Sequence, residues 1–216
     1  MRRRKIDGTT VSHEAGPARP RPVGASAAPV GRPRFFVALL PDAAAAGALA
    51  RLAGSLAAAS EGRALAGADM HLTLAFIGAR DASFGERLEP AIAPVAADAR
   101  SEPLLLTRIG RFGRGRRPAL FWAGPDGTPP WLDALAGQVR AALRAMPCEF
   151  DERPLVPHLS LVRGASPDAD PAPLLAPPVR VSAWRLAVGH NRPAGAPLRY
   201  VWSGSTGRHE TVKALS

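Results

Sequence analysis

Cysteine is almost missing from this chain of 216 residues, in which Cys148 is the single example. One thiol excludes an internal disulfide and any zinc site built from several cysteines. No segment approaches the roughly 18 consecutive apolar residues of a membrane span. The basic run at residues 2–5 is not followed by the apolar segment of a secretory signal. We therefore expect a soluble, cytoplasmic protein with no membrane partner.

Lysine is scarce as well, because only Lys5 and Lys213 are lysines among 28 basic residues, and the rest are arginines. The formal net charge is +10 and the sequence pI is about 11.4. Such a charge favours an anionic partner, which can be a nucleic acid, a phosphorylated ligand or an acidic surface. Alanine, proline and glycine are abundant, so a GC-rich genome accounts for part of the arginine excess. The charge alone therefore does not identify the partner.

Residues 1–32 differ in composition from the rest of the chain. They are rich in Pro, Gly, Ser and Arg and show no periodic apolar pattern, which is typical of a disordered tail. Seven basic and two acidic residues give this tail a charge of +5, half of the total. We expect one domain over residues 33–204 and a frayed C-terminal end at 205–216. Hydrophobic residues make up 46% of the chain, as in ordinary globular proteins.

Apolar runs separated by turn residues predict strands and helices in mixed order. Strands are expected at residues 34–40, 71–78, 103–109, 118–124, 158–163, 179–189 and 198–203. Helices are expected at 42–60, with Asp42 as the N-cap, and at 82–98 and 128–146. Short loops between neighbouring strands favour antiparallel pairing, so we expect an α+β fold. A helix followed by a His-Leu-hydroxyl-Leu strand occurs in each half, which suggests two pseudo-symmetric lobes that share a cleft.

A duplicated tetrapeptide is the most informative feature of the sequence. His71-Leu72-Thr73-Leu74 recurs as His158-Leu159-Ser160-Leu161. Residues i and i+2 of a strand point to the same face. Each strand is therefore expected to present one imidazole and one hydroxyl on one face, while the leucines and Phe76 point into the core.

Two imidazoles and two hydroxyls in one cleft suit the cleavage of a phosphodiester. A neutral imidazole can take a proton from the nucleophile, and a protonated one can give a proton to the leaving oxygen. The hydroxyls of Thr73 and Ser160 can donate hydrogen bonds to the non-bridging phosphate oxygens. This scheme requires no metal and no other cofactor.

Two other interpretations of the histidines are a structural role and a metal site. A single His-x-Thr or His-x-Ser on a strand is usually structural, but two copies in matching contexts favour a functional role. A metal site is the other use of two histidines, yet no acidic residue or cysteine lies within either motif to complete it. The other three histidines, His13, His190 and His209, are assigned no role.

The paired His-x-[Thr/Ser]-x motifs resemble those of the two-histidine (2H) phosphoesterase superfamily. The branch that they resemble most is that of the RNA 2′,3′-cyclic phosphodiesterases, which are also described as 2′–5′ RNA ligases. Four segments carry this resemblance: RFFVALLP (34–41), HLTLAFIG (71–78), RGRRPALFWAG (114–124) and RPLVPHLSLVR (153–163). Ser160 departs from the threonine that is usual there, but it keeps the hydroxyl.

The resemblance implies a bilobal α+β fold, with antiparallel sheets around a central cleft and helices outside. It also implies hydrolysis of a 2′,3′-cyclic phosphate at an RNA end to a 2′-phosphate. By family analogy, His71 protonates the 3′ oxygen and His158 activates water, while Thr73 and Ser160 hold the phosphate. The expected partners are RNA with such ends, including tRNA fragments, or nucleotides, and we expect a monomer.

Several further residues are weaker candidates for substrate binding. The resemblance places an arginine suited to base stacking or phosphate binding at Arg153, and Arg163 ends the second motif strand. Phe36 is a candidate for stacking on the terminal base, although a first-strand Phe is more often core. Residues 108–117 hold five arginines, of which Arg114, Arg116 and Arg117 stand closest to the following strand. Interleaved with glycine and Phe112, they suit a phosphate-binding arm or a solvated hairpin.

Three other functions remain open at this point. The same site can act as a 2′–5′ RNA ligase, because an alcohol then replaces water in the same reaction. A non-catalytic RNA-binding module would use the arginines, but it would not need two imidazoles. A 2H enzyme that acts on a small cyclic nucleotide is the third.

Overall fold

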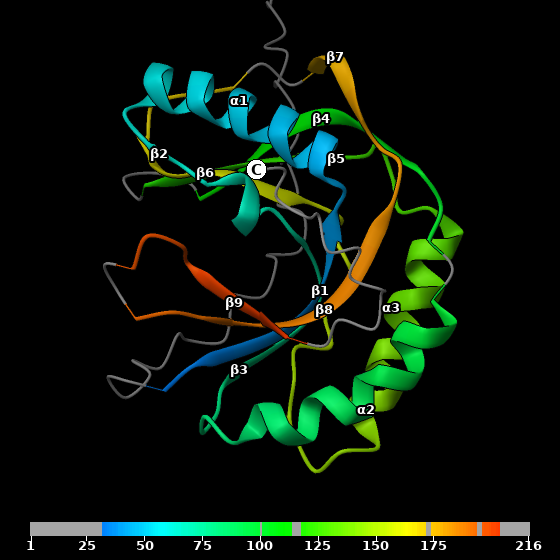
Figure 1. Ribbon diagram of the computed structural model, residues 1–216. Helices are drawn as coiled ribbons and strands as arrows, with labels where there is room; N and C mark the ends of the chain where they lie inside the picture. Colours follow the sequence, from blue (N-terminus) through cyan, green and yellow to red (C-terminus); the bar gives the residue numbers. More distant parts are fainter. Residues whose placement is uncertain (1–31, 100, 114–117, 172–173, 194–195, 204–216) are drawn as a thin grey trace, which may run out of the picture. The chain divides into compact units, whose positions relative to one another are not determined.

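The computed structural model describes residues 32–99, 101–113, 118–171, 174–193 and 196–203 (Figure 1). All of them belong to one unit, Gly31–Ser216, to which the following description is confined. The expected tail up to residue 31 and the expected frayed end at 205–216 lie outside the described residues. So do three of the candidate arginines, Arg114, Arg116 and Arg117.

Strands and helices alternate along the chain much as the apolar pattern predicts. The strands are β1 (Arg34–Pro41), β2 (Arg63–Ala64), β3 (Leu72–Ala79), β4 (Leu104–Phe112), β5 (Ala119–Gly124), β6 (Leu159–Ala165), β7 (Leu174–Val181), β8 (Trp184–Asn191) and β9 (Tyr200–Ser203). The helices are α1 (Ala43–Ser60), the short 3₁₀ helix η1 (Gly67–Asp69), α2 (Phe84–Asp98) and α3 (Pro130–Arg144). The strands pair antiparallel in the order β7-β4-β5-β6-β3-β1-β8-β9, and β2 pairs with β6. The expected α+β class with antiparallel pairing is confirmed.

The sheet consists of two groups of four strands that meet at one point. β3-β1-β8-β9 form the first half-sheet and β7-β4-β5-β6 form the second. Between β3 and β6, pairing in the described chain is confined to Leu72 opposite Leu159. Helix α1 packs on β6 and β7 of the second half-sheet, while α2 packs on β8 and α3 on β3 of the first (Figure 1). The junction of the two half-sheets is therefore also the place where the two His motifs meet.

Both motif strands carry a β-bulge at the same place. Thr73 pairs with Ala38 but Ala75 pairs with Val37, so Leu74 is an extra residue in β3. In β6, Leu161 is likewise extra between Ser160 and Val162 in the pairing with β5. Each bulge lies three residues after its histidine and inverts the alternation of faces that follows it.

The bulges correct one expectation about the core. Strict alternation would bury Phe76 together with the leucines of the motif. Because Leu74 and Ala75 are both buried instead, the alternation shifts by one residue and Phe76 is 43% exposed. The leucines themselves, Leu72, Leu74, Leu159 and Leu161, are buried as expected.

The segment predicted as one strand at 179–189 is two strands, β7 and β8, which lie in different half-sheets. The break is at Ser182 and Ala183, whose backbone N–H groups donate to Oδ2 of Asp42 at 2.8 and 3.2 Å. Oδ1 of Asp42 accepts from the Ala45 N–H at 2.9 Å, so the predicted N-cap of α1 is confirmed. These hydrogen bonds lower the pKa of the Asp42 carboxyl. A single carboxylate thus starts a helix and ends a strand some 140 residues away.

Helix α1 is long and apolar enough to cross a membrane by length and composition, with a mean hydropathy of 1.2 over 18 residues. It is the one such helix among the described residues. No segment of this kind was expected from the sequence. The buried residues of α1, Ala45, Leu49 and Ala53, recur every four positions, and the helix packs against β6. The core helix of a soluble protein can have the same length and mean hydropathy, so this finding is weak evidence that α1 spans a membrane.

Candidate functional site

The two motifs place their four polar side chains around the junction of the half-sheets. His71 directly precedes β3 and His158 directly precedes β6. Because Leu72 pairs antiparallel with Leu159, the register sets His71 beside Ser160 and Thr73 beside His158 on the neighbouring strand. His71 and Ser160 are buried, and Thr73 and His158 are half-buried. The structure thus brings all four predicted residues of the duplicated motif together.

Both imidazoles are oriented by the same backbone contact. Nδ1 of His71 lies 2.7 Å from the carbonyl oxygen of Asp69, and Nδ1 of His158 lies 2.7 Å from that of Val156. A carbonyl oxygen only accepts hydrogen bonds, so Nδ1 carries the proton and donates in each case. In the neutral ring, Nε2 is then the unprotonated nitrogen. Each histidine is therefore prepared to exchange a proton through Nε2.

Burial and positive charge keep both imidazoles neutral at pH 7. Burial is the main cause that lowers the pKa of His71 from 6.5 to about 4, and the charges of Arg163 and His158 lower it further. The pKa of His158 is also lowered, first by burial and then by Arg163, against the hydrogen bond to Val156. A bound phosphate would act in the opposite direction, because a nearby negative charge favours the imidazolium.

Aromatic rings enclose His71. The Phe36 ring stacks on the imidazole with centroids 5.1 Å apart, and Tyr200 and Trp202 meet it edge-on at 4.8 and 5.2 Å. Gly189 makes room for them, since a Cβ there would lie 2.5 Å from Trp202 and 2.8 Å from Phe36. Phe36 is only 4% exposed, so its ring packs against His71 in the protein interior. This burial argues against the expected stacking of Phe36 on a base.

Arg163 brings a positive charge to the histidines, and among the described residues it forms no ion pair. Its Nη2 donates to the Tyr200 hydroxyl at 3.0 Å, and its Nε is buried without a hydrogen-bond partner in the described part of the chain. The Tyr200 ring lies 4.8 Å from the His71 imidazole, so this hydrogen bond sets the guanidinium beside His71. Its positive charge lowers the pKa of both imidazoles. Of the two weaker arginine candidates that the structure describes, Arg153 and Arg163, it is Arg163 that lies at the histidines.

Asp69 is a buried carboxylate that the sequence analysis missed. Its side chain accepts from the backbone N–H groups of Arg199 and Tyr200 at 3.0 to 3.3 Å, while its carbonyl accepts from His71. It therefore connects the orientation of His71 with the placement of Tyr200. The sequence holds a faint signal for this, because Asp69 lies two residues before the histidine and Tyr200 is the single tyrosine.

His158 has a more open aromatic surrounding. The Phe112 ring meets it edge-on at 4.9 Å, and Trp122 lies 6.1 Å away. Phe112 and Trp122 themselves lie 5.5 Å apart with their planes inclined by 31°. Phe112 is 40% exposed, whereas Phe36 on the other side is buried. The two histidines therefore have the same hydrogen-bonded orientation, but the surroundings of His158 are more open to solvent than those of His71.

The other predicted arginines occupy different positions. Arg153 is exposed on the loop before β6 and forms an ion pair with Asp151. Arg108 and Arg111 lie within β4, which extends through Phe112, and not in a loop. Arg108 pairs with Asp126 at 3.2 Å, and Arg111 donates to the carbonyl oxygens of Pro167 and Ala169. These two arginines are therefore engaged within the fold, while Arg114, Arg116 and Arg117, the candidate residues of the expected arm, lie outside the described residues.

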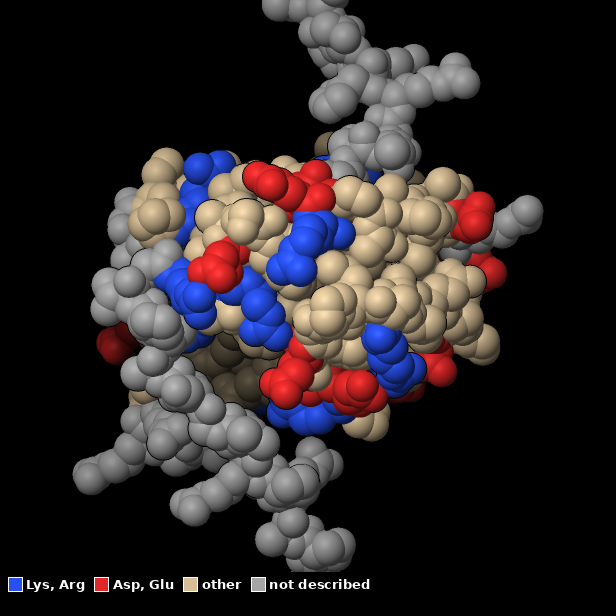
Figure 2. Space-filling view, turned by 90° about the horizontal axis from the view of Figure 1, so that it is seen from below, with Lys and Arg blue, Asp and Glu red and all other residues tan. Residues whose placement is uncertain are grey.

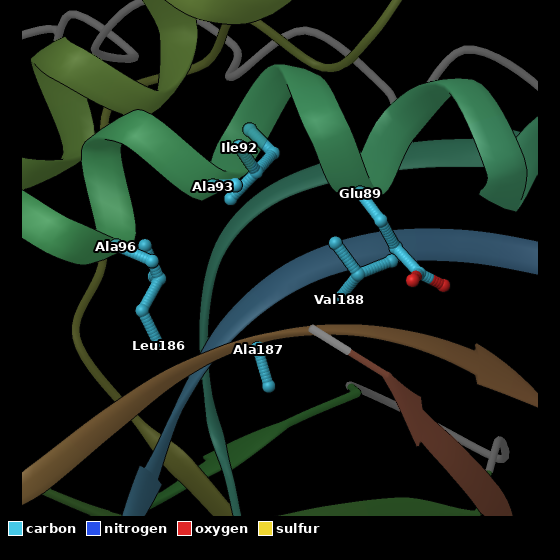
Figure 3. A pocket seen from close by; sticks show the side chains of 7 residues that line it. All are labelled: Glu89, Ile92, Ala93, Ala96, Leu186, Ala187 and Val188. Carbon is cyan, nitrogen blue, oxygen red and sulfur yellow. The ribbon is translucent and has the colours of Figure 1, made fainter. Parts of the chain in front are cut away.

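Surface charge is mixed on the face shown in Figure 2. Basic and acidic side chains alternate there, and several basic ones border a hollow. A separate crevice between α2 and β8 is lined by Ile92, Leu186 and Val188, with Glu89 at its edge (Figure 3). Its volume of about 20 Å³ has room for one water molecule and not for a nucleotide. The duplicated motif, and not this crevice, is therefore the candidate site.

The chain is similar in sequence to known proteins. The chain is 30% identical over 133 residues to an RNA 2′,3′-cyclic phosphodiesterase of Geobacillus stearothermophilus, an alignment that covers 61% of this chain and 42% of that protein. It is 33% identical over 105 residues to one of Escherichia coli, covering 49% and 57%. The aligned part thus spans about half the length of these relatives.

Solved structures show the same fold. The crystal structure of E. coli LigT complexed with 3′-AMP superposes with a TM-score of 0.58 at 25% identity, covering 80% of this chain and 94% of that one. The family model described as the 2′-5′ RNA ligase superfamily matches residues 40–190, a range that includes both His motifs. The resemblance seen in the sequence is confirmed, and the chain belongs to the 2′-5′ RNA ligase superfamily.

Proposed function

We propose that this protein is a metal-independent RNA 2′,3′-cyclic 3′-phosphodiesterase. The observation that carries the proposal is the matched pair of histidines, each with Nδ1 held by the carbonyl two residues earlier and Nε2 left for proton exchange. In this proposal the half-sheets act as two lobes and the cyclic phosphate binds between them. The relatives named as RNA 2′,3′-cyclic phosphodiesterases support the same substrate class.

In the proposed reaction, water attacks phosphorus in line with the 3′ oxygen. Nε2 of His158 takes a proton from the water as the new P–O bond forms. Nε2 of His71 gives a proton to the 3′ oxygen as the P–O3′ bond breaks, which leaves a 2′-phosphate and a 3′-hydroxyl. The order of the two histidines follows the family analogy.

Burial leaves His71 neutral in the free protein, so its proposed role as the acid depends on proton uptake when substrate binds. Its low pKa makes the imidazolium a strong acid, but the ring is unprotonated before substrate binds. The negative charge of the phosphate raises this pKa, so His71 takes up a proton from solvent when the substrate binds. Arg163, Thr73 and Ser160 then stabilise the charge that builds on the non-bridging oxygens.

The direct test uses an oligoribonucleotide that ends in a 2′,3′-cyclic phosphate, in the presence of EDTA. We expect conversion to a 2′-phosphate end, and loss of that conversion in His71→Ala and in His158→Ala. His190→Ala is a matched control, because His190 lies on β8 against Phe35 and outside the candidate site. Circular dichroism verifies that each variant is folded. Full activity in either motif variant contradicts the two-histidine mechanism.

Product analysis separates the alternatives. A 3′-phosphate product would keep the chemistry but reverse the acid and base. An added RNA with a 5′-hydroxyl tests the ligase reaction, in which that hydroxyl replaces water and a 2′–5′ linkage forms. Binding of RNA without any turnover would instead favour a non-catalytic module.

A further inference from the structure

We propose that Asp69 is a positioning residue that holds His71 and Arg163 in one arrangement. In the proposed reaction these two groups have separate tasks, since His71 gives a proton and Arg163 stabilises the charge on the phosphate. The inference rests on that proposed function. It adds a residue that acts through other residues of the site to keep both groups aligned.

Asp69 is the one acidic side chain that is buried among the described residues, with 2% of its surface exposed. The other buried polar residues have evident uses, because His71 and Ser160 belong to the motifs and the Ser60 hydroxyl donates within its own helix. A carboxylate is costly to bury unless hydrogen bonds compensate it. The hydrogen bonds of Asp69 therefore indicate what the residue does.

Asp69 uses its backbone and its side chain in two directions. Its carbonyl oxygen accepts from Nδ1 of His71 at 2.7 Å. Its carboxylate accepts from the backbone N–H groups of Arg199 and Tyr200 at 3.0 to 3.3 Å, where β9 begins. The carbonyl that orients His71 is therefore tied to the position of β9.

A second hydrogen bond joins η1 to β9. The carbonyl oxygen of Ala68 accepts from Nε1 of Trp202 at 3.0 Å. The Trp202 and Tyr200 rings of β9 both meet the His71 imidazole edge-on, at 5.2 and 4.8 Å. A shift of β9 relative to η1 would therefore move the rings and the carbonyl that together fix this imidazole.

The link continues from β9 to the guanidinium. Nη2 of Arg163 donates to the Tyr200 hydroxyl at 3.0 Å, while its Nε is buried without a partner in the described chain. The orientation of Arg163 thus depends on where Tyr200 lies. Because Asp69 holds the backbone of Tyr200, one carboxylate reaches both the imidazole and the guanidinium.

The second motif shows that a carboxylate is not needed to orient a single histidine. Val156 lies two residues before His158, and its carbonyl accepts from Nδ1 of that ring at 2.7 Å, as Asp69 does for His71. Its side chain is apolar and 54% exposed, so it holds nothing. The carboxylate at the matching place in the first motif therefore has a further task, which is the link to Tyr200 and Arg163.

The first measurement is the pKa of His158 in an NMR titration of Asp69→Asn. The charge of Arg163 lowers this pKa, and Asp69 itself has no direct part in it. Weaker support of Arg163 should therefore raise the pKa of His158 toward 6.5. Tyr200→Phe, which removes only the hydroxyl, should raise it as well. The double variant should show no larger rise than Tyr200→Phe alone, because both residues act through the same link.

The second measurement is kcat for an oligoribonucleotide that ends in a 2′,3′-cyclic phosphate. Asp69→Asn is expected to lower kcat about 10–100-fold, because a displacement of about 1 Å can cost about 100-fold in rate. Asp42→Asn is the matched control. Its carboxylate also accepts from backbone N–H groups of a distant segment, Ser182 and Ala183, but from no described residue of the site. The control should lose stability and keep both kcat and the pKa of His158.

Three results would overturn the inference. If Asp69→Asn changes kcat and the pKa of His158 no more than Asp42→Asn does, Asp69 is only structural. A reduced kcat with an unchanged pKa of His158 would show that Asp69 acts on His71 alone. Rises in this pKa that add up in the double variant would show that Asp69 and Tyr200 act independently.

Two further arms keep the test decisive. If Asp69→Asn does not fold, Tyr200→Phe tests the same link, because it keeps the ring beside His71, and an unchanged pKa of His158 in it overturns the inference. If the wild-type protein does not convert the cyclic phosphate, the proposed function fails. The NMR comparison then still decides whether Asp69 positions Arg163.

Discussion

Replacement of His71 by asparagine is expected to remove a large part of the acid sensitivity of the fold. In the unfolded chain, an ordinary histidine takes up a proton near pH 6.5, whereas burial lowers the pKa of His71 to about 4 in the folded chain. Between these values the unfolded state binds more protons, so the free energy of unfolding falls as the pH is lowered. Above pH 6.5 the effect vanishes, and below pH 4 it is complete.

The size of the effect follows from the two pKa values. Each unit of pKa difference corresponds to about 1.4 kcal/mol, so complete protonation costs about 3 kcal/mol of stability. Between pH 7 and pH 5, linkage gives a loss of about 2 kcal/mol. Because the domain as a whole has a stability of about 5–15 kcal/mol, this loss is readily measured. Asparagine keeps an amide donor for the Asp69 carbonyl but does not titrate.

Urea denaturation of both proteins at several pH values between 5 and 7 measures the difference. The wild type should lose about 2 kcal/mol more than His71→Asn over this interval. His158, whose pKa is lowered as well, contributes equally to both proteins and cancels. If the free energy of unfolding changed with pH in the same way in both proteins, the conclusion that His71 is buried in its neutral form would be refuted.

Three further predictions concern the residues around the site. In Arg163→Met, the pKa of both histidines should rise in an NMR titration, because the cation that lowers them is lost, and kcat/KM should fall. Asp69→Asn should lower the free energy of unfolding by about 1–3 kcal/mol in urea denaturation, since the N–H groups of Arg199 and Tyr200 lose a charged acceptor; unchanged stability would contradict its role. Asp42→Ala should lower the free energy of unfolding by about 1–2 kcal/mol, because the N-cap of α1 and the hydrogen bonds to the β7–β8 break are lost together. A loss of only about 1 kcal/mol would indicate that the cap alone contributes.

The elements with strong local signals were predictable from the sequence. Helix α1 begins at the predicted Asp42 cap, and β3 and β6 begin at the duplicated motif. The division of 179–189 was not predictable, because its cause is a carboxylate some 140 residues away. The exposure of Phe76 was missed for a related reason, since a bulge is defined by the register between two strands.

The candidate site also has some properties that follow from the sequence and others that depend on the tertiary structure. The sequence by itself determined the reactive groups, because a period of two in a strand sets His71 with Thr73 and His158 with Ser160 on shared faces. Tertiary structure alone decided which nitrogen is free, how far burial lowers each pKa, and which aromatic rings stand around each imidazole. These properties depend on solvent exclusion and on contacts between distant segments, as between His71 and Tyr200. A pattern of neighbouring residues carries no information on such contacts, and so the two alike motifs acquire one enclosed and one open histidine only in the folded chain.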